Sequence, residues 1–386
     1  MQLSVIILNY NVRYFLELCV LSVQKAIQDI DAEIIVIDNN SSDDSCQMMK
    51  SRFPNIKLIE NKVNAGFPKG NNVGVAEAKG EYICILNPDT VVGEDTFTKI
   101  LDFATSSAVE MHNASLGIVG CKLIDGTGNF LPESKRGVPT PFVAFTKIFG
   151  LYKFSNVFGK YYAQHVNENE SGKIDILVGA FMMIKRELYL EIGGFDENCF
   201  MYSDDIDLSY MISQKGKSNY YFHETTVIHY KGESTVKDET YMKRFQEAMN
   251  FFYKKHFKIS IFFSVFMKVG IVFFSFVKKF QGKPKPKNLP ESYILISNNQ
   301  KLQETLEKQL QKRVKMESRT QSFSENKNIE IIFDTNFVDF KTIIASLEWN
   351  KNNNLTFKII PQSSDFMLGS NSSHDRGEII SIVDLK

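Results

Sequence analysis

Aspartate residues stand at three places in this sequence where a carboxylate could do chemistry. Asp38 and Asp89 each follow an apolar run, and Asp204, Asp205 and Asp207 form one dense cluster. A carboxylate oxygen is a suitable ligand for a hard cation such as Mg²⁺ or Mn²⁺, which commonly shares its coordination shell with substrate phosphates. Adjacent carboxylates repel each other, and this repulsion raises the pKa of at least one of them, which suits a general base.

Each of these aspartates also has a structural interpretation. Asn87-Pro88-Asp89 could be a turn that ends a strand, because proline has no N–H for the next ladder hydrogen bond. The cluster follows Ser203, a good N-cap, and acidic side chains are favoured in the first turn of a helix. On the residues alone, the two interpretations of Asp89 are equally good. The density of charge in the cluster favours a functional role there.

His229 lies in a short apolar run at residues 226–230. A lone histidine is more often a hydrogen-bonded structural residue than a metal ligand. Because the chain also offers Asp89 and the acidic cluster, a ligand role for His229 is about as well supported as a structural one. No Ser–His or Cys–His arrangement points to a covalent enzyme intermediate.

The elements that would position these side chains are predicted from apolar runs at residues 5–8, 33–38, 56–59 and 83–86. Runs that are apolar throughout are typical of parallel strands buried on both faces, and helical patterns separate several of them. In such doubly wound sheets ligands bind at the carboxyl ends of the strands. Asp38 and Asp89 are therefore expected at the same edge of one sheet.

Residues 64–74 are rich in glycine and asparagine. Such residues let the backbone approach a ligand closely, and a helix is predicted from Val73 to Ala78. A turn and a helix cap explain the composition about as well, since neither GxxxxGK[ST] nor GxGxxG is present. Further on, residues 132–172 are predicted as a loop-rich insertion of the kind that forms an active-site lid, and residues 174–184 as a strand region with a glycine kink.

Taken in order, these motifs resemble glycosyltransferase family 2. The first four are Leu8-Asn9-Tyr10-Asn11, Val36 to Asp43, Asn64-Ala65-Gly66-Phe67 with Gly70-Asn71-Asn72, and Leu86-Asn87-Pro88-Asp89. Three later motifs resemble its rhamnosyltransferase-like branch: Val178-Gly179-Ala180, Gly193-Gly194-Phe195-Asp196, and Tyr202 to Leu208. The resemblance covers residues 1–255.

The resemblance implies a GT-A fold, which is a Rossmann-like, doubly wound mixed sheet, and inverting transfer from a nucleotide-diphosphate sugar with Mg²⁺ or Mn²⁺. It assigns Asp205 as the catalytic base beside Asp204, and Asp89 and His229 as metal ligands. Asp38 would read the donor's base. The residues that it implies for substrate binding are Asn9, Tyr10, Asn11, Asp38, Asn40, Asn64, Gly66, Phe67, Gly70, Asn71, Asn87, Gly179 and Asp207. The sequence departs from the family's DxD motif at Asn87, and it has Asp204 where many relatives have glutamate.

The character of the sequence changes after residue 257. Residues 259–277 are almost entirely apolar, lysines flank them, and no acidic residue occurs from Ala248 to Pro290. A charge such as Lys268 costs about 2.5–3.5 kcal/mol at the centre of a bilayer. On a helix this lysine shares one narrow stripe with serines. The pattern therefore predicts a helix lying on an anionic membrane surface, with a buried core helix as the alternative.

Residues 282–290 have the composition of a proline-stiffened linker. Strand-like runs follow at residues 293–297, 329–334, 355–360 and 379–383, with helical patterns at 302–314 and 340–349. They predict a small Rossmann-like α/β domain with no evident catalytic set. The predicted division is therefore a glycosyltransferase domain at 1–257, a membrane-associated helix and linker at 258–290, and this small domain at 291–386.

Composition limits the partners of the chain. Its 386 residues include 45 basic and 45 acidic side chains, so the net charge is zero and gives no general case for nucleic-acid binding. Five scattered cysteines without a CxxC pair and the lack of a signal-like N-terminus predict a cytosolic protein. The expectation is an enzyme at the inner face of a bacterial plasma membrane. It would transfer a sugar, with rhamnose as first candidate, to a glycan or polyprenyl-linked glycan. The alternatives are an inactive nucleotide-sugar-binding scaffold, another donor sugar, or a protein acceptor.

Overall fold

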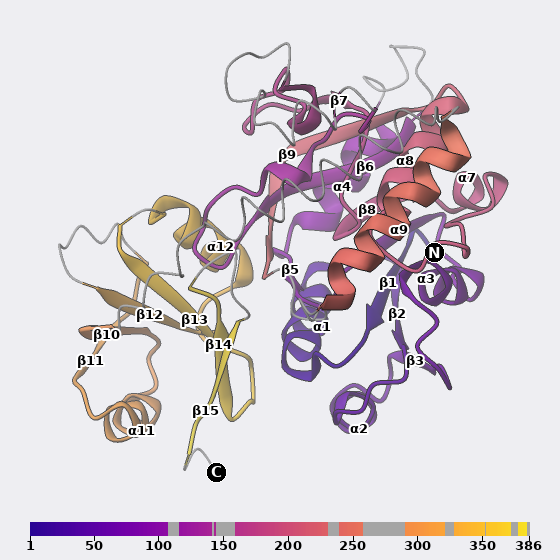
Figure 1. Ribbon diagram of the computed structural model, residues 1–386. Coiled ribbons are helices and arrows are strands. Elements are labelled where there is room, and N and C mark those ends of the chain that lie inside the picture. Colours follow the sequence, from indigo (N-terminus) through magenta and orange to yellow (C-terminus); the bar gives the residue numbers. More distant parts are fainter. Residues whose placement is uncertain are drawn as a thin grey trace.

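The computed structural model describes residues 1–106, 116–140, 143, 159–230, 239–257, 290–320, 328–351, 353–371 and 377–383. They form two α/β units, each built on its own sheet (Figure 1). The predicted membrane segment at residues 259–277 and the linker after it lie outside the described residues. Within the described ranges, no helix is long and apolar enough to cross a membrane.

The first sheet has nine strands of mixed direction, in the order β3-β2-β1-β4-β8-β6-β9-β5, with β7 paired to β9. Strands β1 (Leu3–Asn9), β2 (Ala32–Asp38), β3 (Lys57–Glu60) and β4 (Tyr82–Leu86) run parallel. The others are β5 (Thr90–Val91), β6 (Leu116–Ile124), β7 (Gly172–Ile174), β8 (Phe181–Lys185) and β9 (Ser218–His229). This arrangement confirms the predicted doubly wound, mixed α/β sheet.

Helices cover both faces of this sheet, which explains why the parallel strands are apolar throughout. The helices α1 (Arg13–Ala26), α2 (Ser45–Arg52) and α4 (Thr96–Thr105) share one core cluster with alternate residues of β1, such as Val5 and Ile7. The opposite face packs Ile6 and Leu8 against α3 (Phe67–Ala76), α7 (Arg186–Glu191) and α8 (Asp204–Gln214).

Most of the glycine- and asparagine-rich stretch at residues 64–74 is helical. Helix α3 begins at Phe67, six residues before the predicted start, so Gly70 and Gly74 lie inside it. A Cβ on Gly70 would lie 2.5 Å from the Leu8 side chain, and one on Gly74 would lie 2.4 Å from Ile37. These glycines therefore serve the close approach of α3 to the sheet, which depends on a tertiary contact and not on local composition.

The predicted strand region at residues 174–184 is also interrupted. Strand β7 ends at Ile174, and β8 begins only at Phe181. The turn between them contains Gly179. Strand β9 begins at Ser218, earlier than the apolar run at residues 226–230 indicates.

The second unit has a six-stranded sheet in the order β11-β10-β12-β13-β14-β15. Its parallel strands are β10 (Ser292–Ile296), β11 (Val314–Glu317), β12 (Ile329–Asp334) and β13 (Leu355–Ile360). Strands β14 (Phe366–Gly369) and β15 (Glu378–Ser381) are antiparallel to their neighbours. Helix α11 (Gln300–Leu310) ends earlier than predicted, because Gln311 is left-handed and the chain then enters β11, which was not predicted.

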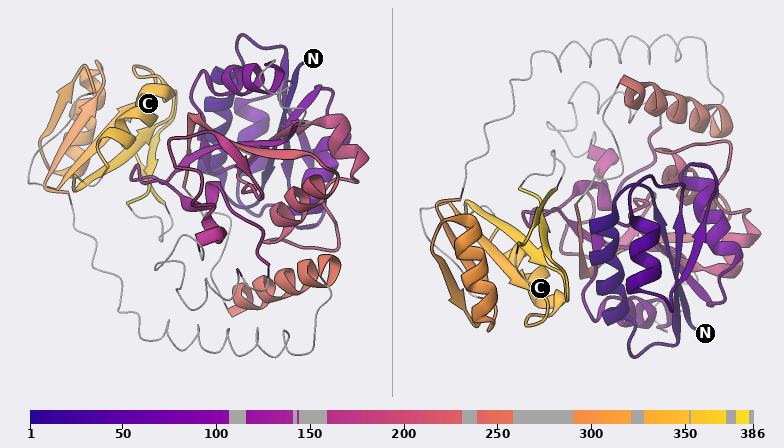
Figure 2. Two further views of the ribbon diagram at one scale, coloured as in Figure 1. Left: turned by 90° about the horizontal axis from the view of Figure 1, so that it is seen from above. Right: turned by 90° about the horizontal axis from the view of Figure 1, so that it is seen from below.

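The two units share one hydrophobic core. It joins Phe15 of α1, Val91 of β5 and Ile228 of β9 with residues of the second sheet and of α12 (Phe340–Trp349). The Glu94 carboxylate also accepts hydrogen bonds from the N–H groups of Phe340 and Lys341, each at 2.8 Å. In Figures 1 and 2 the second unit accordingly lies beside the β5 and β9 side of the first.

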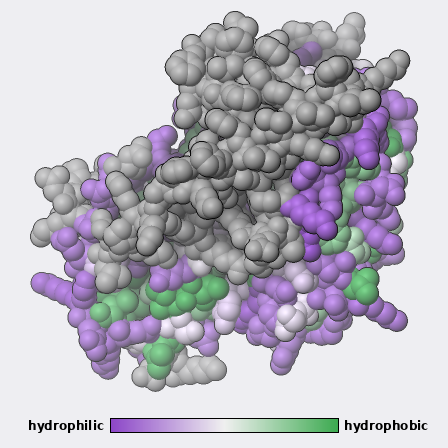
Figure 3. All heavy atoms as spheres, in the orientation of Figure 1, coloured by the Kyte–Doolittle hydropathy of each residue, from purple (hydrophilic) through white to green (hydrophobic). Residues whose placement is uncertain are grey.

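Exposed large hydrophobic side chains in the described ranges are scattered, and include Val63, Leu190, Phe200 and Trp349. On the face shown in Figure 3, the described surface is mainly hydrophilic, with small hydrophobic areas between. Single exposed apolar residues of this kind are normal on a protein surface.

Candidate active site

Asn87, Asp89 and His229 meet at one end of the first sheet. Strand β5 pairs with β9 so that Thr90 lies opposite His229, and the Tyr230 N–H donates to the Asp89 carbonyl at 2.9 Å. This pairing brings His229 Nε2 to 3.4 Å from Asp89 Oδ1 and 3.4 Å from Asn87 Nδ2. The predicted ligand pair is thus adjacent in space because of strand pairing.

Three atoms of this group are buried without a hydrogen-bond partner: Asn87 Oδ1, Asp89 Oδ1 and His229 Nδ1. Buried polar atoms without partners are costly, so their presence in one group calls for an explanation. Two oxygens and an imidazole nitrogen are donors that a divalent cation accepts. The described residues contain no cluster of three His, Cys, Asp or Glu suited to a metal. The unpartnered nitrogen of His229 is Nδ1, whereas the ring turns Nε2 toward Asp89 and Asn87.

The loops that follow β1 and β2 form one polar unit at the same edge. Asn9 Nδ2 donates to Asp38 Oδ1 at 2.8 Å, and the Ser41 N–H donates to Asp38 Oδ2 at 2.8 Å. Asn11 and Asn40 have positive φ values of 55° and 64°, a region that asparagine tolerates better than most residues. Asp38 is only 3% exposed, and its position is therefore fixed.

Asn39 was not singled out from the sequence, where it counted only as part of a turn. Its side chain donates to Asn64 Oδ1 at 2.9 Å and to the Gly66 carbonyl at 3.2 Å, and accepts from Asn61 Nδ2 and the Ala65 N–H at 3.1 Å each. Asn39 therefore ties the loop before α3 to the end of β2. Only the run Asp38-Asn39-Asn40 could have signalled this role.

The Asn64 to Phe67 motif lies against the segment that precedes α8. Gly66 has φ +84°, and a Cβ there would lie 2.6 Å from the Phe200 carbonyl oxygen. The Phe67 N–H donates to that same oxygen at 2.9 Å. The Phe67 ring packs edge-on to Phe195, and its Cζ lies 3.5 Å from where a Cβ on Gly179 would be.

The acidic cluster opens α8. Ser203 holds the N-cap position, but its side chain makes no capping hydrogen bond, and its Oγ lies 3.2 Å from Cys199 Sγ. Asp205 Oδ2 accepts hydrogen bonds from Arg136 Nη2 at 2.6 Å and from the Gly179 N–H at 3.0 Å. Arg136 lies in the predicted insertion and was not singled out, because a single arginine in a long loop carries no signal in the sequence.

One short segment connects the base candidate with the metal candidates. The Gly179 N–H binds Asp205, and the next residue, Ala180, accepts the Asn87 N–H through its carbonyl at 3.0 Å. Strand β8 begins here and pairs antiparallel with β4, so that Phe181 lies opposite Leu86. The Asp205 side chain and the group formed by Asn87, Asp89 and His229 therefore lie on either side of the same turn.

Asp204 and Asp205 are nearly buried, with 7% and 8% exposed. Burial raises the pKa of Asp204 to about 7, and the negative charge of Asp205 adds to the effect. The raised pKa predicted for the cluster is thus found at Asp204.

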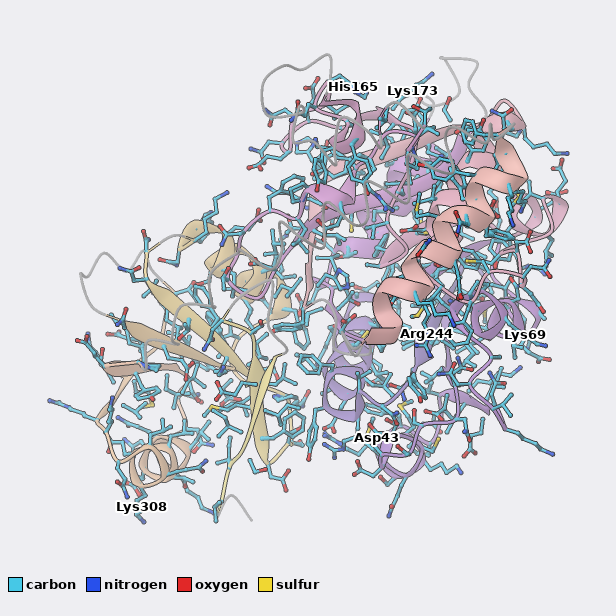
Figure 4. The ribbon with its side chains drawn as sticks, in the orientation of Figure 1. Asp43, Lys69, His165, Lys173, Arg244 and Lys308 are labelled. Carbon is cyan, nitrogen blue, oxygen red and sulfur yellow. The ribbon has the colours of Figure 1, made fainter. Side chains whose placement is uncertain are left out.

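Asp207 has contacts that favour a positioning role over the predicted substrate-binding role. His256 Nε2 lies 2.5 Å from its Oδ1 and Lys255 Nζ lies 2.8 Å from its Oδ2. Both partners belong to α9 (Glu239–His256), which Asp207 therefore holds against α8. Nearer the start of α9, the Arg244 guanidinium lies 5.2 Å from the Phe200 ring centroid, and Figure 4 labels Arg244 on this helix.

Apart from Phe67, Gly179 and the acidic cluster described above, the predicted site residues fall into two sets. Those gathered at or near the carboxyl ends of the strands are Asn9, Tyr10, Asn11, Asp38, Asn40, Asn64, Gly66, Asn87, Asp89 and His229. Gly70 and Asn71 lie instead within α3, where the Asn71 side chain donates to the Phe67 carbonyl at 2.9 Å. Asn71 Oδ1 is buried without a partner.

Comparison with known proteins identifies the class to which this fold and site belong. Residues 4–193 match the sequence profile of Glycosyl transferase family 2. The first unit, which carries this match, belongs to this family and has the GT-A fold.

The chain is also similar to particular members of the family. The chain is 25% identical over 216 residues to the N-acetylglucosaminyl-diphospho-decaprenol L-rhamnosyltransferase of Mycobacterium tuberculosis, covering 53% of this chain and 68% of the relative. It is 25% identical over 225 residues to the rhamnosyltransferase WbbL of Escherichia coli, covering 54% and 78%. Among solved structures, the Pyrobaculum calidifontis mannosyltransferase in complex with GDP-Man and Mn²⁺ matches with 16% identity and a TM-score of 0.45, covering 73% of this chain and 76% of that one.

Proposed function

We propose that this protein is a metal-dependent inverting glycosyltransferase. It transfers a sugar, with rhamnose as first candidate, from a nucleotide-diphosphate sugar to a lipid-linked glycan. The observation that carries the proposal is the turn at Gly179 and Ala180, which is hydrogen-bonded to Asp205 on one side and to Asn87 on the other. The names of the mycobacterial and E. coli relatives support rhamnose as the sugar, and the mycobacterial name supports a polyprenyl-linked acceptor.

The donor side of the reaction needs a neutralised diphosphate. Asp89, His229 and Asn87 would hold a divalent cation, Mg²⁺ or Mn²⁺, because Asp89 Oδ1 and Asn87 Oδ1 have no hydrogen-bond partner and His229 turns its Nε2 toward Asp89 Oδ1. When bound, such a cation acts as a Lewis acid that stabilises negative charge on the leaving diphosphate. The fixed loops at Asn9 and Asp38 would bind the nucleotide, since they lie at the same edge of the sheet.

The acceptor side needs a base. Within the described residues, both hydrogen bonds to the Asp205 carboxylate go to Oδ2, so Oδ1 is available to an acceptor hydroxyl. Asp205 takes the proton of that hydroxyl while the hydroxyl oxygen attacks the anomeric carbon from the face opposite the diphosphate. The configuration at the anomeric carbon is then inverted in one step.

A panel of nucleotide-sugar donors tests the proposal directly. The purified protein is incubated with each donor, a polyprenyl-diphosphate-linked acceptor, and Mg²⁺, Mn²⁺ or EDTA. We expect transfer from one deoxysugar or hexose donor, dependent on the cation. Binding of a donor without any turnover would instead favour the nucleotide-sugar-binding scaffold. Turnover with another donor or with a protein acceptor would correct the substrate and keep the enzyme class.

Residues 259–277 suggest how such an enzyme reaches a lipid-linked acceptor. Their apolar character and the lysines around them favour attachment to the inner face of the plasma membrane. The full chain should sediment with vesicles that contain anionic lipid, and high salt should weaken this binding by screening the lysines. Phe262→Asp with Phe273→Asp should release it. Equal binding to neutral vesicles at high salt, or none at all, would contradict this part of the proposal.

A further inference from the structure

The backbone of Arg136 is held in place by hydrogen bonds of its own, independently of its side chain. It exchanges two hydrogen bonds with Ile176, each N–H donating to the other's carbonyl at 2.9 Å. These bonds form an isolated antiparallel bridge just after the 3₁₀ turn Pro132–Ser134. The position of the guanidinium is therefore defined beside the segment between β7 and β8 that leads to Gly179.

The guanidinium of Arg136 is buried against the Asp205 carboxylate. Its Nη2 donates to Asp205 Oδ2 at 2.6 Å and to the Leu177 carbonyl at 3.1 Å, and the residue is 9% exposed. Burial alone would lower the pKa of Arg136, but the carboxylate of Asp205 outweighs burial and raises it, so the guanidinium stays charged. A charged donor at this distance favours the ionised form of the carboxylate, which burial would otherwise disfavour.

Asp204 lacks such a partner. It forms no ion pair in the part of the chain that the structure describes, although it precedes Asp205 directly and is equally buried. The charge of Arg136 also lowers the pKa of Asp204, but burial and the charge of Asp205 outweigh this effect and raise it. The other titratable groups that face the pair are Tyr161 and Glu133 beside Arg136, and Tyr189 and Cys199 beside Asp204. None of these is a cation, so Arg136 is the one positive charge in this set.

We propose that Arg136 decides which of the two adjacent aspartates takes the acceptor's proton. It holds Asp205 in the ionised form with Oδ1 available, and it leaves Asp204 to carry a proton. In the transfer step the acceptor O–H bond breaks, and the proton passes to Asp205 Oδ1. The O–H electron pair forms the new bond to the anomeric carbon, and the bond from that carbon to the diphosphate breaks with its electrons. This step rests on the proposed function, but the selection by Arg136 does not.

The test compares Arg136→Met with Lys135→Met as a matched control. Lys135 is the neighbouring buried cation, and its Nζ donates to the carbonyls of Tyr162 and Ala163, not to either aspartate. The full chain carries ¹³C-labelled aspartate carboxyls, assigned with Asp204→Asn and Asp205→Asn, and is titrated by NMR without substrate. We expect Asp205 to titrate below Asp204 in the wild type, and Arg136→Met to move the Asp205 midpoint upward by at least one pH unit. Lys135→Met should leave it in place.

Kinetics give a second readout. For Arg136→Met, kcat/KM at pH 6.5 should fall at least tenfold and recover partly at pH 8.5, while donor affinity stays within twofold and Arg136→Lys restores most of the rate. An unchanged Asp205 midpoint in Arg136→Met overturns the inference even if the enzyme is active. A shifted midpoint in a protein that turns over no donor contradicts the proposed function and leaves the inference standing. If Arg136→Met does not fold, Arg136→Gln, which also lacks the charge, takes its place with the same expectations.

Discussion

Three polar side chains make up the proposed donor side of the site. Asn87, Asp89 and His229 each have a buried atom without a hydrogen-bond partner. Leaving such atoms unpaired costs about 1–3 kcal/mol each. A bound cation would remove that cost, and the site should therefore be most stable when it is filled.

Asp89→Ala and His229→Ala should both lose metal-dependent donor binding, because each removes a donor atom of the group. Isothermal titration with Mn²⁺ in the absence of donor should show at least a tenfold weaker affinity for either variant. His223→Ala is the matched control, since His223 lies on the same strand and contacts Ser171 instead. Activity that survives EDTA unchanged would remove the metal role from both residues.

Asp205→Asn should reduce turnover by roughly 10²–10⁴, the usual contribution of a general base. Asparagine keeps the shape of the side chain and can still accept from Gly179, so donor affinity should change little. Single-turnover transfer and donor binding are measured separately on the same preparation. Near-normal turnover would exclude Asp205 as the base.

Asp204 should make stability depend on pH in a defined direction. Burial raises its pKa from the usual 3.8 to about 7, so between these values the folded state binds more protons than the unfolded state. Stability should therefore be greatest below about pH 4 for this group and fall as pH rises to about 7. Asp204→Asn should flatten that fall in urea unfolding at pH 5 to 8, whereas the exposed Asp102→Asn should not. A steeper fall in the variant would contradict this sign.

Strands and helices bring these residues together, and the sequence predicts some of the contacts between them but not others. The parallel strands were predictable, because residues such as Val5 and Ile85 belong to runs that are apolar on both faces. The start of α3 and the partner of Asp205 were not predictable. Gly70 is required by its close approach to Leu8, and Arg136 is positioned by backbone hydrogen bonds to Ile176, and both partners are distant in the sequence. A local sequence pattern does not indicate which distant residue will be in contact. The strand ends with their aspartates were thus predictable, and the surroundings that set each carboxylate's charge were not.

Helix α9 should depend on one buried carboxylate of α8. Asp207 is 1% exposed and bonds both Lys255 and His256, so Asp207→Asn leaves the Lys255 ammonium without its buried counter-charge. Breaking a buried pair in this way costs roughly 3–5 kcal/mol, and the partly exposed lysine places the expected loss near the lower value. Urea unfolding measures it.

Asp196→Asn is the matched control for that loss. Asp196 bonds the same Lys255 at 2.7 Å but is more exposed. It should lose about 1 kcal/mol or less, as exposed pairs do. Equal losses for Asp196→Asn and Asp207→Asn would show that burial of Asp207 is not what holds α9.

In the whole molecule, the second unit is joined to the strands that carry the metal candidates. Val91 of β5 and Ile228 of β9 share a core with the second sheet, and these two residues pair with each other next to Asp89 and His229. The Glu94 carboxylate adds a direct contact by accepting two N–H groups at the start of α12, where the helix dipole favours a negative charge.

Glu94→Ala should loosen the contact between the units. Losing a charged cap of two N–H groups should cost about 1–2 kcal/mol of unfolding free energy. Limited proteolysis should then release the second unit sooner than in the wild type. Glu224→Ala removes an exposed carboxylate from β9 and is the control. Identical cleavage rates for both variants would deny Glu94 a role in holding the units together.

The shared core has a thermodynamic consequence, because coupling between two sites is reciprocal. If docking of the second unit steadies β5 and β9, then a cation held by Asp89 and His229 must steady the docking by the same free energy. Amide hydrogens at the start of α12 should then exchange more slowly when Mn²⁺ and donor are added, although the cation would be bound on strands of the other unit. The second unit would in this way report on the occupancy of a site whose proposed ligands, Asn87, Asp89 and His229, all lie in the first unit.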